Sequence, residues 1–312
     1  MPASGRRSSP QFGLLVDDTV AAGGEPAGRL ARAAERAGFE SLWSGERVKW
    51  RDEPPESWVP APNPLIVLAY WAGMTRRLTV ATGVLRLPRD PATLAREMAT
   101  LARLAPGRVV LGIGVGGVYE EVRRPGLRPD ERARRTDAYV RDVRSAWERD
   151  QDRSAFSGTG EARGSVPVIV GGRSEPAARR AGRLGDGFFP LATSWEVVER
   201  LVGVMRQAAA TAGRDPAAVA VTCLGSARFD EMDRSRWREL GVSRVVFPLP
   251  GRGGAGWEAG LAELAERTRR MIRVAPTDAA RPAEMSRGSV SRRRVRRSRN
   301  VESLQEPGGR GA

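Results

Sequence analysis

The residues best suited to bind a ligand form the segment Gly171-Gly172-Arg173-Ser174, which directly follows an apolar run. Two glycines let the backbone approach a ligand closely, and Ser174 can cap a helix that begins near Glu175. The free N–H groups at a helix start attract anions, and a guanidinium can donate paired hydrogen bonds to a phosphate. This spacing predicts a phosphate site, although a capped helix beside a solvated arginine fits the same residues.

Glycines also follow two other apolar runs. The segment Thr82-Gly83-Val84 ends one run, and Gly112-Ile-Gly114-Val-Gly116-Gly117 ends another. Such glycines indicate close approach of the backbone to a ligand, or a bulge and a turn. The second segment is not interpreted as a dinucleotide-binding fingerprint, because no helix is expected to follow it directly.

A loop rich in tryptophan and charge runs from Ser44 to Trp58. Aromatic side chains beside charged ones suit a pocket for a flat ring, and they suit a lid that packs on the protein equally well. Glu46 can carry a proton if burial raises its pKa, although an exposed structural glutamate fits as well. Arg47 can stabilise negative charge but cannot act as a base.

The chain contains no histidine and a single cysteine, Cys223. This composition excludes Ser-His-Asp and Cys-His catalysis and any His-ligated metal. It also excludes an internal disulfide, a zinc ribbon and an iron–sulfur cluster. We therefore expect no metal site.

The formal net charge of +15 arises almost wholly from arginine, because Lys49 is the single lysine. Abundant Arg, Ala, Gly and Pro are typical of a GC-rich bacterial genome. The last forty residues hold ten arginines against four acids, without the interleaved aromatics that stack on bases. We therefore do not expect nucleic acid as a partner.

No apolar run reaches the roughly 18–20 residues that a membrane span needs. The apolar run after the polar N-terminus covers only Phe12 to Val16, too short for a signal peptide. The sequence predicts a cytoplasmic protein without a membrane segment.

Strand-like and helix-like segments alternate along the chain. Strands are expected at residues 12–16, 39–43, 78–84, 108–113, 166–170, 187–191, 218–224 and 242–248. Helices are expected at residues 27–38, 65–72, 91–104, 129–148, 175–184, 195–213, 233–240 and 256–273. Eight apolar strands, each followed by a helix, favour an α/β fold of the (β/α)8 TIM-barrel type, with a doubly wound open sheet as the alternative.

The predicted barrel domain covers residues 11–273. Residues 1–10 are predicted to be a disordered N-terminus. Residues 274–312 have no periodicity and are rich in Arg, Ser, Gly and Pro, so they are predicted to be a disordered basic tail.

Four motifs occur in order and together resemble the luciferase-like monooxygenase family. They are Gly38-Phe-Glu-Ser-Leu-Trp43 with Gly45-Glu46, Ala81-Thr-Gly-Val-Leu-Arg-Leu-Pro88, Leu111-Gly-Ile-Gly-Val-Gly-Gly117, and Pro167-Val-Ile-Val-Gly-Gly-Arg-Ser174. The resemblance covers most of residues 12–200, whereas residues 200–272 match only in the rhythm of strands and helices.

The resemblance implies a barrel enzyme that binds a flavin or deazaflavin at the carboxyl ends of its strands. It implies hydride transfer between coenzyme F420 and a small organic substrate, and often a homodimer; an FMN-dependent monooxygenase that uses molecular oxygen is the alternative. A non-proline cis peptide is implied at Gly83–Val84. The implied cofactor-binding residues are Thr82, Gly83, Val84, Gly114, Gly116, Gly171, Gly172, Arg173 and Ser174.

The chain departs from the family at the predicted catalytic residues, Glu46 and Arg47. Arg47 stands where the family commonly has a histidine that acts as acid, base or ring contact. The stretch from Gly158 to Val166 is also short for the family. A catalytically inactive barrel that binds a cofactor or a partner is therefore a further alternative.

Overall fold

The structure of the chain is a computed structural model. It describes residues 10–16, 18–21, 23–45, 62–86, 90–114, 129–153, 166–192, 194–225, 233–249 and 256–273. The predicted basic tail at 274–312, and all but the last residue of the predicted N-terminal segment 1–10, lie outside these ranges.

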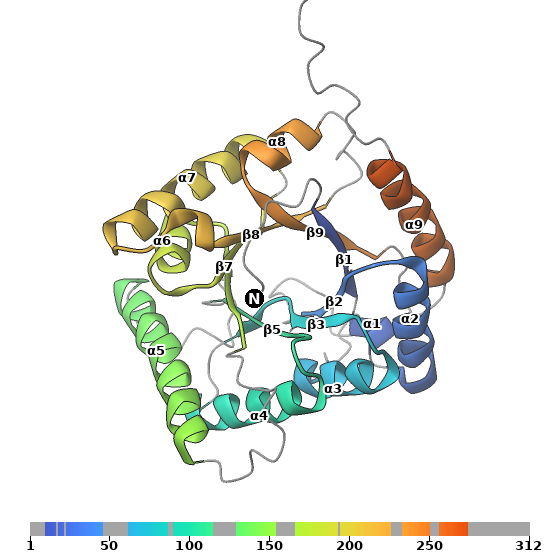
Figure 1. Cartoon of the computed structure of the whole chain (residues 1–312), viewed down its shortest axis with the longest axis horizontal. Helices are drawn as coiled ribbons and strands as arrows, with labels where there is room; N and C mark the ends of the chain where they lie inside the picture. The colour runs from blue at the N-terminus through green and yellow to red at the C-terminus, as the bar shows by residue number, and fades with distance from the viewer. Residues whose placement is uncertain are drawn as a thin grey trace, which may run out of the picture. The chain divides into compact units, whose positions relative to one another are not determined.

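Parallel strands form a closed ring at the centre of the fold, and helices surround it (Figure 1). The strands are β1 (Gln11–Val16), β2 (Ser41–Ser44), β3 (Thr79–Thr82), β4 (Leu85–Arg86), β5 (Val109–Gly114), β6 (Val168–Gly172), β7 (Gly187–Pro190), β8 (Ala220–Leu224) and β9 (Val242–Pro248). The ring closes because β3 pairs with β5, while the two-residue β4 pairs only with β5. The predicted (β/α)8 barrel is confirmed, and the open-sheet alternative is wrong.

Each strand of the ring leads into at least one helix. The helices are α1 (Asp18–Ala21), α2 (Gly24–Ala37), α3 (Pro64–Met74), α4 (Pro91–Leu104), α5 (Pro129–Arg153), α6 (Glu175–Leu184), α7 (Trp195–Thr211), α8 (Asp233–Glu239) and α9 (Trp257–Arg273), with a 3₁₀ turn at Pro216–Ala218. The sequence predicts the bounds of α4, α6 and β9 correctly, and it predicts most other strands and helices with shifted ends. It does not predict α1, β4 or the 3₁₀ turn.

Local capping explains why several helices begin and end where they do. The Asp90 carboxylate accepts a hydrogen bond from the Thr93 N–H at 2.7 Å, and Pro91 occupies the first position of α4. The Asn63 side chain accepts from the Leu65 N–H at 2.9 Å in the same way at α3. Gly38 ends α2 in the left-handed region with a φ of 91°.

The predicted strand 78–84 is the clearest difference, because it ends at Thr82. The Thr82 hydroxyl donates to the Gly112 carbonyl at 2.7 Å and accepts from the Gly112 N–H at 2.8 Å. The Thr82 hydroxyl thus bonds to the N–H and the carbonyl of Gly112. If β3 continued, its backbone would form hydrogen bonds with these two groups. The chain then turns at Gly83-Val84 before β4 pairs with β5.

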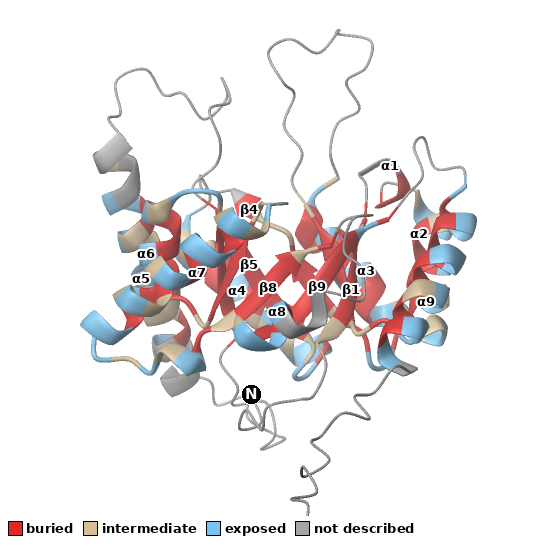
Figure 2. Ribbon diagram, turned by 90° about the horizontal axis from the view of Figure 1, so that it is seen from above, coloured by how far each residue is buried: buried red, intermediate tan, exposed pale blue. Residues whose placement is uncertain are grey.

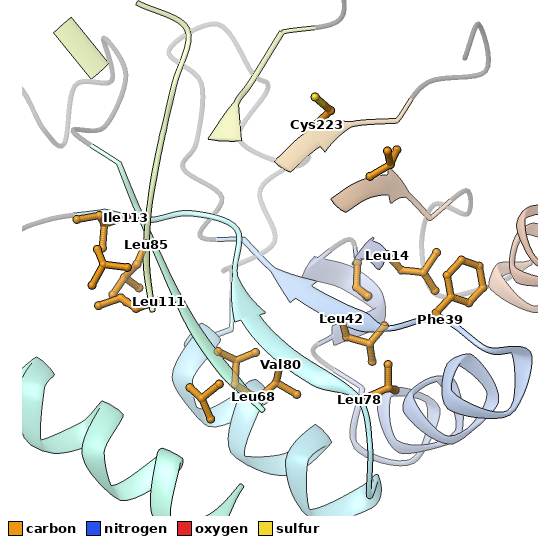
Figure 3. Packing of buried hydrophobic residues seen from close by; sticks show 14 of the residues in the cluster. Leu14, Phe39, Leu42, Leu68, Leu78, Val80, Leu85, Leu111, Ile113 and Cys223 are labelled. Carbon is orange, nitrogen blue, oxygen red and sulfur yellow. The ribbon is translucent and has the colours of Figure 1, made fainter. Parts of the chain in front are cut away.

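The core has two layers, inside and outside the ring of strands. Figure 2 shows buried strands and helices whose outer faces are exposed. The outer layer lies between strands and helices, as Leu14, Leu42 and Phe39 do in Figure 3. A separate inner cluster is formed by strand residues alone: Trp43, Ala81, Val110, Ile169, Phe189 and Val246.

The part of the chain that the structure describes has no helix long and apolar enough to span a bilayer. In the same residues no group of three or more His, Cys, Asp or Glu side chains is arranged to hold a metal ion.

Candidate functional site

The segment Gly83-Val84 lies at the carboxyl end of β3, and its two residues are joined by a cis peptide bond. The resemblance implied this bond at this position, and that prediction is confirmed. The Gly83 N–H donates to the Ser44 carbonyl at 2.8 Å, which ties the segment to the end of β2. A Cβ at Gly83 would lie 3.2 Å from Leu15 Cδ1 and 3.3 Å from Trp43 Cβ, so the interior of the barrel leaves little room for a side chain there.

The Val84 side chain fills the space beside two of the predicted cofactor glycines. A Cβ at Gly114 would lie 2.7 Å from Val84 Cγ2, and a Cβ at Gly171 would lie 2.6 Å from Val84 Cγ1. Both distances are too short for real side chains, so glycine is needed at the ends of β5 and β6 to receive Val84. The structure therefore brings Gly83, Val84, Gly114 and Gly171 together, and we call Gly83-Val84 the platform.

Thr82, another predicted cofactor residue, is fully buried below the platform. Its hydroxyl is engaged in both directions with Gly112, as donor and as acceptor. Thr82 can therefore serve a ligand site by fixing the backbone rather than by offering a free hydroxyl.

The predicted phosphate segment follows β6 and opens α6. Gly171 is buried, Gly172 is half-buried, and Arg173 and Ser174 are exposed. Ser174 occupies the predicted cap position, but its side chain accepts no hydrogen bond from the helix, so the predicted side-chain cap is wrong. The first N–H groups of α6 therefore point toward the carboxyl end of the barrel without a side-chain acceptor from Ser174.

Charges near the start of α6 favour an anion. Glu175 is the first helical residue, and its carboxylate alone would repel a phosphate. It pairs with Arg179 at 2.9 Å and with Arg200 of α7 at 3.0 Å. These two arginines offset Glu175, which leaves the Arg173 charge and the helix N-terminus to attract a ligand.

Beside the platform, the carboxyl ends of the strands present an apolar floor. Leu15, Val84, Leu191 and Leu224 are half-buried and pack on the inner cluster. They belong to β1, the β3–β4 turn, the end of β7 and β8, whose carboxyl ends meet at one end of a parallel barrel. An apolar floor with a few polar groups at its edge suits a flat ring system.

Sequence reasoning missed one polar group at this end, the Ser44 hydroxyl. Ser44 is fully buried at the end of β2, and its Oγ has no hydrogen-bond partner among the described residues. Buried hydroxyl groups usually have a partner, so this oxygen is a candidate contact for a bound group. Nothing in the local sequence distinguishes Ser44 from other strand serines.

The lone cysteine offers no chemistry. Cys223 of β8 is fully buried, and burial raises the pKa of its thiol to about 12. A thiol with such a pKa stays protonated near neutral pH and is a poor nucleophile.

Three predicted site residues lie outside the described ranges: Glu46, Arg47 and Gly116. The two catalytic assignments therefore remain predictions.

Relatives in sequence include proteins with and without a described activity. Uncharacterized protein Rv0953c from Mycobacterium tuberculosis is 28% identical over 261 residues, which are 75% of this chain and 91% of that protein. An F420-dependent glucose-6-phosphate dehydrogenase from Kineococcus radiotolerans is 30% identical over 221 residues, 65% of this chain and 63% of the dehydrogenase.

Solved structures share the fold at lower identity. An F420-dependent secondary alcohol dehydrogenase in complex with an F420-acetone adduct aligns with a TM-score of 0.65 at 16% identity, over 83% of this chain and 98% of its own. Monooxygenase RslO1 from Streptomyces bottropensis aligns with a TM-score of 0.62 at 20% identity, over 84% of this chain and 99% of its own. Residues 11–291 also match the sequence model of the family described as luciferase-like monooxygenase, and the chain therefore belongs to the luciferase-like monooxygenase family.

Proposed function

We propose that the protein is an oxidoreductase that binds coenzyme F420 at the carboxyl ends of its strands and acts on a small organic substrate. One observation carries the proposal: the platform, the apolar floor and the open start of α6 lie together at this end of the barrel. These features offer one surface for a flat ring and another for a phosphate.

The described residues fit the two chemical parts of such a cofactor. Gly171, Gly172, Arg173 and Ser174 would hold the phosphate through backbone N–H groups and the Arg173 guanidinium. The ring would lie against Val84 and the apolar floor. Ser44, at the end of the neighbouring strand β2, has a buried Oγ without a hydrogen-bond partner among the described residues. A phosphate in this position would also satisfy N–H groups that Ser174 leaves uncapped.

When bound, a deazaflavin supplies a two-electron hydride acceptor and donor. The chain's own part is to orient the ring and substrate and to exclude water from the apolar floor. We assign Glu46 the role of proton carrier, and Arg47 the role of stabilising negative charge on a substrate oxygen. Arg47 cannot remove a proton, so the base must be another group.

The choice of F420 is supported by relatives about 30% identical that are named F420-dependent glucose-6-phosphate dehydrogenases. An FMN-dependent monooxygenase is the second candidate, because the family itself is named for monooxygenases. In both cases the phosphate and the ring would use the same residues.

The test is a titration of the purified full chain with coenzyme F420 and, separately, with FMN, in which fluorescence quenching reports binding. We expect saturable binding with a lower Kd for F420, and turnover with at least one member of a panel of alcohols. Tighter binding of FMN with oxygen consumption would favour the monooxygenase. Binding without turnover would favour an inactive barrel, and binding of neither cofactor would overturn the proposal.

We also propose, from the family resemblance, that the protein forms a homodimer. Light scattering coupled to size-exclusion chromatography should give twice the mass of one chain. A monomer at all concentrations tested would contradict this assembly.

A further inference from the structure

Beneath the platform lies Trp43, the largest side chain of the inner cluster. Trp43 is fully buried on β2, and its contacts come from several strands. The indole Nε1 donates to Ser41 Oγ at 2.9 Å. The ring meets the edge of Phe189 with centroids 5.5 Å apart and planes at 70°, a favourable aromatic geometry.

A buried ion pair supports the same ring. The Arg244 guanidinium lies 5.6 Å from the centroid of the Trp43 ring, in cation–π contact. Arg244 is itself fixed, because its Nε and one terminal nitrogen each donate to Glu40 at 2.7 Å. Only 8% of the Arg244 side chain and 19% of the Glu40 side chain are exposed.

On its other side, Trp43 contacts the platform. A Cβ at Gly83 would lie 3.3 Å from both Cβ and Cε3 of Trp43, so the Gly83 backbone rests directly on the indole. Ser44, the next residue after Trp43, accepts the Gly83 N–H at 2.8 Å. The position of Trp43 therefore sets the position of Gly83. Because Val84 is joined to Gly83, it also sets where the Val84 side chain lies beside Gly114 and Gly171.

We propose that Trp43 is a positioning residue, held by Ser41, Phe189 and Arg244, that fixes the platform for the ring of the bound cofactor. The inference rests on the cofactor site proposed above, and it adds a fully buried residue beneath the platform. A platform fixed before binding loses less freedom when the ligand arrives, so the effect of Trp43 falls on cofactor affinity as well as on stability.

The chain offers a matched control for the test. Trp71 is also fully buried, but it lies on α3 in the outer layer, and its Nε1 has no hydrogen-bond partner among the described residues. Trp43→Phe and Trp71→Phe thus make the same chemical change at equal burial. Only the first changes a ring that contacts Gly83 and removes the hydrogen bond that holds this ring.

Two measurements on the full chain separate positioning from packing. The first is the Kd for coenzyme F420, which we expect Trp43→Phe to raise about tenfold and Trp71→Phe to leave within about twofold. The second is hydrogen exchange in a peptide covering residues 79–86 without cofactor. Exchange there should speed up in Trp43→Phe and stay at the wild-type rate in Trp71→Phe.

Ser41→Ala keeps the proposal testable if Trp43→Phe fails to fold. It removes the acceptor of the indole N–H together with a hydrogen bond between Ser41 and Glu40, and it keeps the indole ring in place. We expect faster exchange in the same peptide and a smaller rise in Kd. The inference would be overturned, and the proposed function left intact, if Trp43→Phe and Ser41→Ala both kept the wild-type Kd and exchange rate. Equal effects of Trp43→Phe and Trp71→Phe would overturn it in the same way. Failure of the wild-type chain to bind either cofactor would overturn the proposed function and this inference with it.

Discussion

The two ends of the barrel use polar residues in opposite ways. At the amino ends of the strands, charged side chains are joined to the protein by several bonds each. At the carboxyl ends, an exposed arginine and a helix start that Ser174 does not cap have polar groups without partners among the described residues. The difference separates residues that stabilise the barrel from residues that are available to a ligand.

Glu35 shows the first pattern. Its carboxylate accepts hydrogen bonds from the N–H groups of Arg76, Arg77 and Leu78 at 2.9, 2.6 and 3.1 Å, just before β3. Burial raises the pKa of Glu35, but these backbone bonds outweigh burial and lower it overall. The ionised Glu35 carboxylate thus fixes the backbone of residues 76–78, which lead into β3.

Arginines at this end act in the same way. Arg108 donates to the carbonyls of Ala72 and Leu78 at 3.1 and 3.0 Å. Arg144 pairs with Asp186 at 2.8 Å, and Asp186 in turn accepts from the Val168 N–H at the start of β6. Part of the high arginine content is therefore structural.

At the carboxyl end, the side chains of Arg173 and Ser174 make no such bonds with other described residues. Arg173 and Ser174 are exposed, and Ser174 leaves the helix start uncapped. The Arg173 side chain makes no hydrogen bond or ion pair with another described residue, and it contributes little to the barrel itself. We therefore expect substitutions at the amino end to change stability, and substitutions at the carboxyl end to change binding.

The largest loss of stability should follow Glu40→Gln, which breaks the buried pair with Arg244. Removing one partner of a buried ion pair costs about 3 kcal/mol or more, because the other charge stays buried without its counterion. Urea unfolding should report this loss. Glu25→Gln is the control, since Glu25 and Arg29 are 77% and 51% exposed, and it should cost less than about 0.5 kcal/mol.

The same pair predicts how stability depends on pH. Burial raises the pKa of Glu40, but the Arg244 charge and the hydrogen bonds of Glu40 lower it by more than burial raises it. The net pKa of Glu40 therefore lies below its ordinary 4.5. A lowered pKa in the folded state contributes stability above pH 4.5 that is lost as the pH falls through the lowered value. Urea midpoints measured down to acidic pH should fall less steeply in Glu40→Gln, and an unchanged slope would contradict this role.

Gly171→Ala should change both stability and binding. The added methyl would lie 2.6 Å from Val84 Cγ1, so Val84 must leave its place beside β6. We expect a loss of about 1 kcal/mol in unfolding free energy and at least about tenfold weaker cofactor binding. Gly203→Ala on α7 is a control, because a Cβ there has nothing within 4 Å, and it should leave binding unchanged.

The smallest effect on stability should come from Arg173→Ala, within about 0.5 kcal/mol. Its effect on binding should be larger, since a charge-assisted hydrogen bond to phosphate is worth about 1.5 kcal/mol or more. We expect the Kd for F420 to rise about tenfold or more, measured by fluorescence titration. Arg29→Ala, also exposed but far along the chain on α2, should leave the Kd unchanged; equal effects would undo the contrast between the two ends.

Local chemistry made much of the fold predictable. Asp90-Pro91 starts α4, because a short polar residue that caps the helix before a proline favours a helix start. Pro176 marks the start of α6 by its place in the first turn. The alternation of apolar runs and helices then led to the barrel. The sequence motifs also led to the family and to the cis bond at Gly83–Val84.

Long-range contacts were not predictable in the same way. Glu40 and Arg244 are 204 positions apart, and nothing in either neighbourhood identifies the other. The glycines at 114 and 171 were expected to approach a ligand, but the structure shows that Val84 lies beside them. Both relations depend on how the strands close into a ring, which is set by packing over the whole chain.

The most direct test of the cofactor site compares coenzyme F420 with the same deazaflavin lacking its phosphate-bearing chain. The Kd of each is measured for the wild-type chain and for Arg173→Ala. We predict that the wild type prefers the phosphate-bearing form, and that Arg173→Ala reduces this preference about tenfold while the Kd of the phosphate-free form stays unchanged. Equal affinity of the wild type for both forms, or equal weakening of both by Arg173→Ala, would contradict a phosphate site at the start of α6.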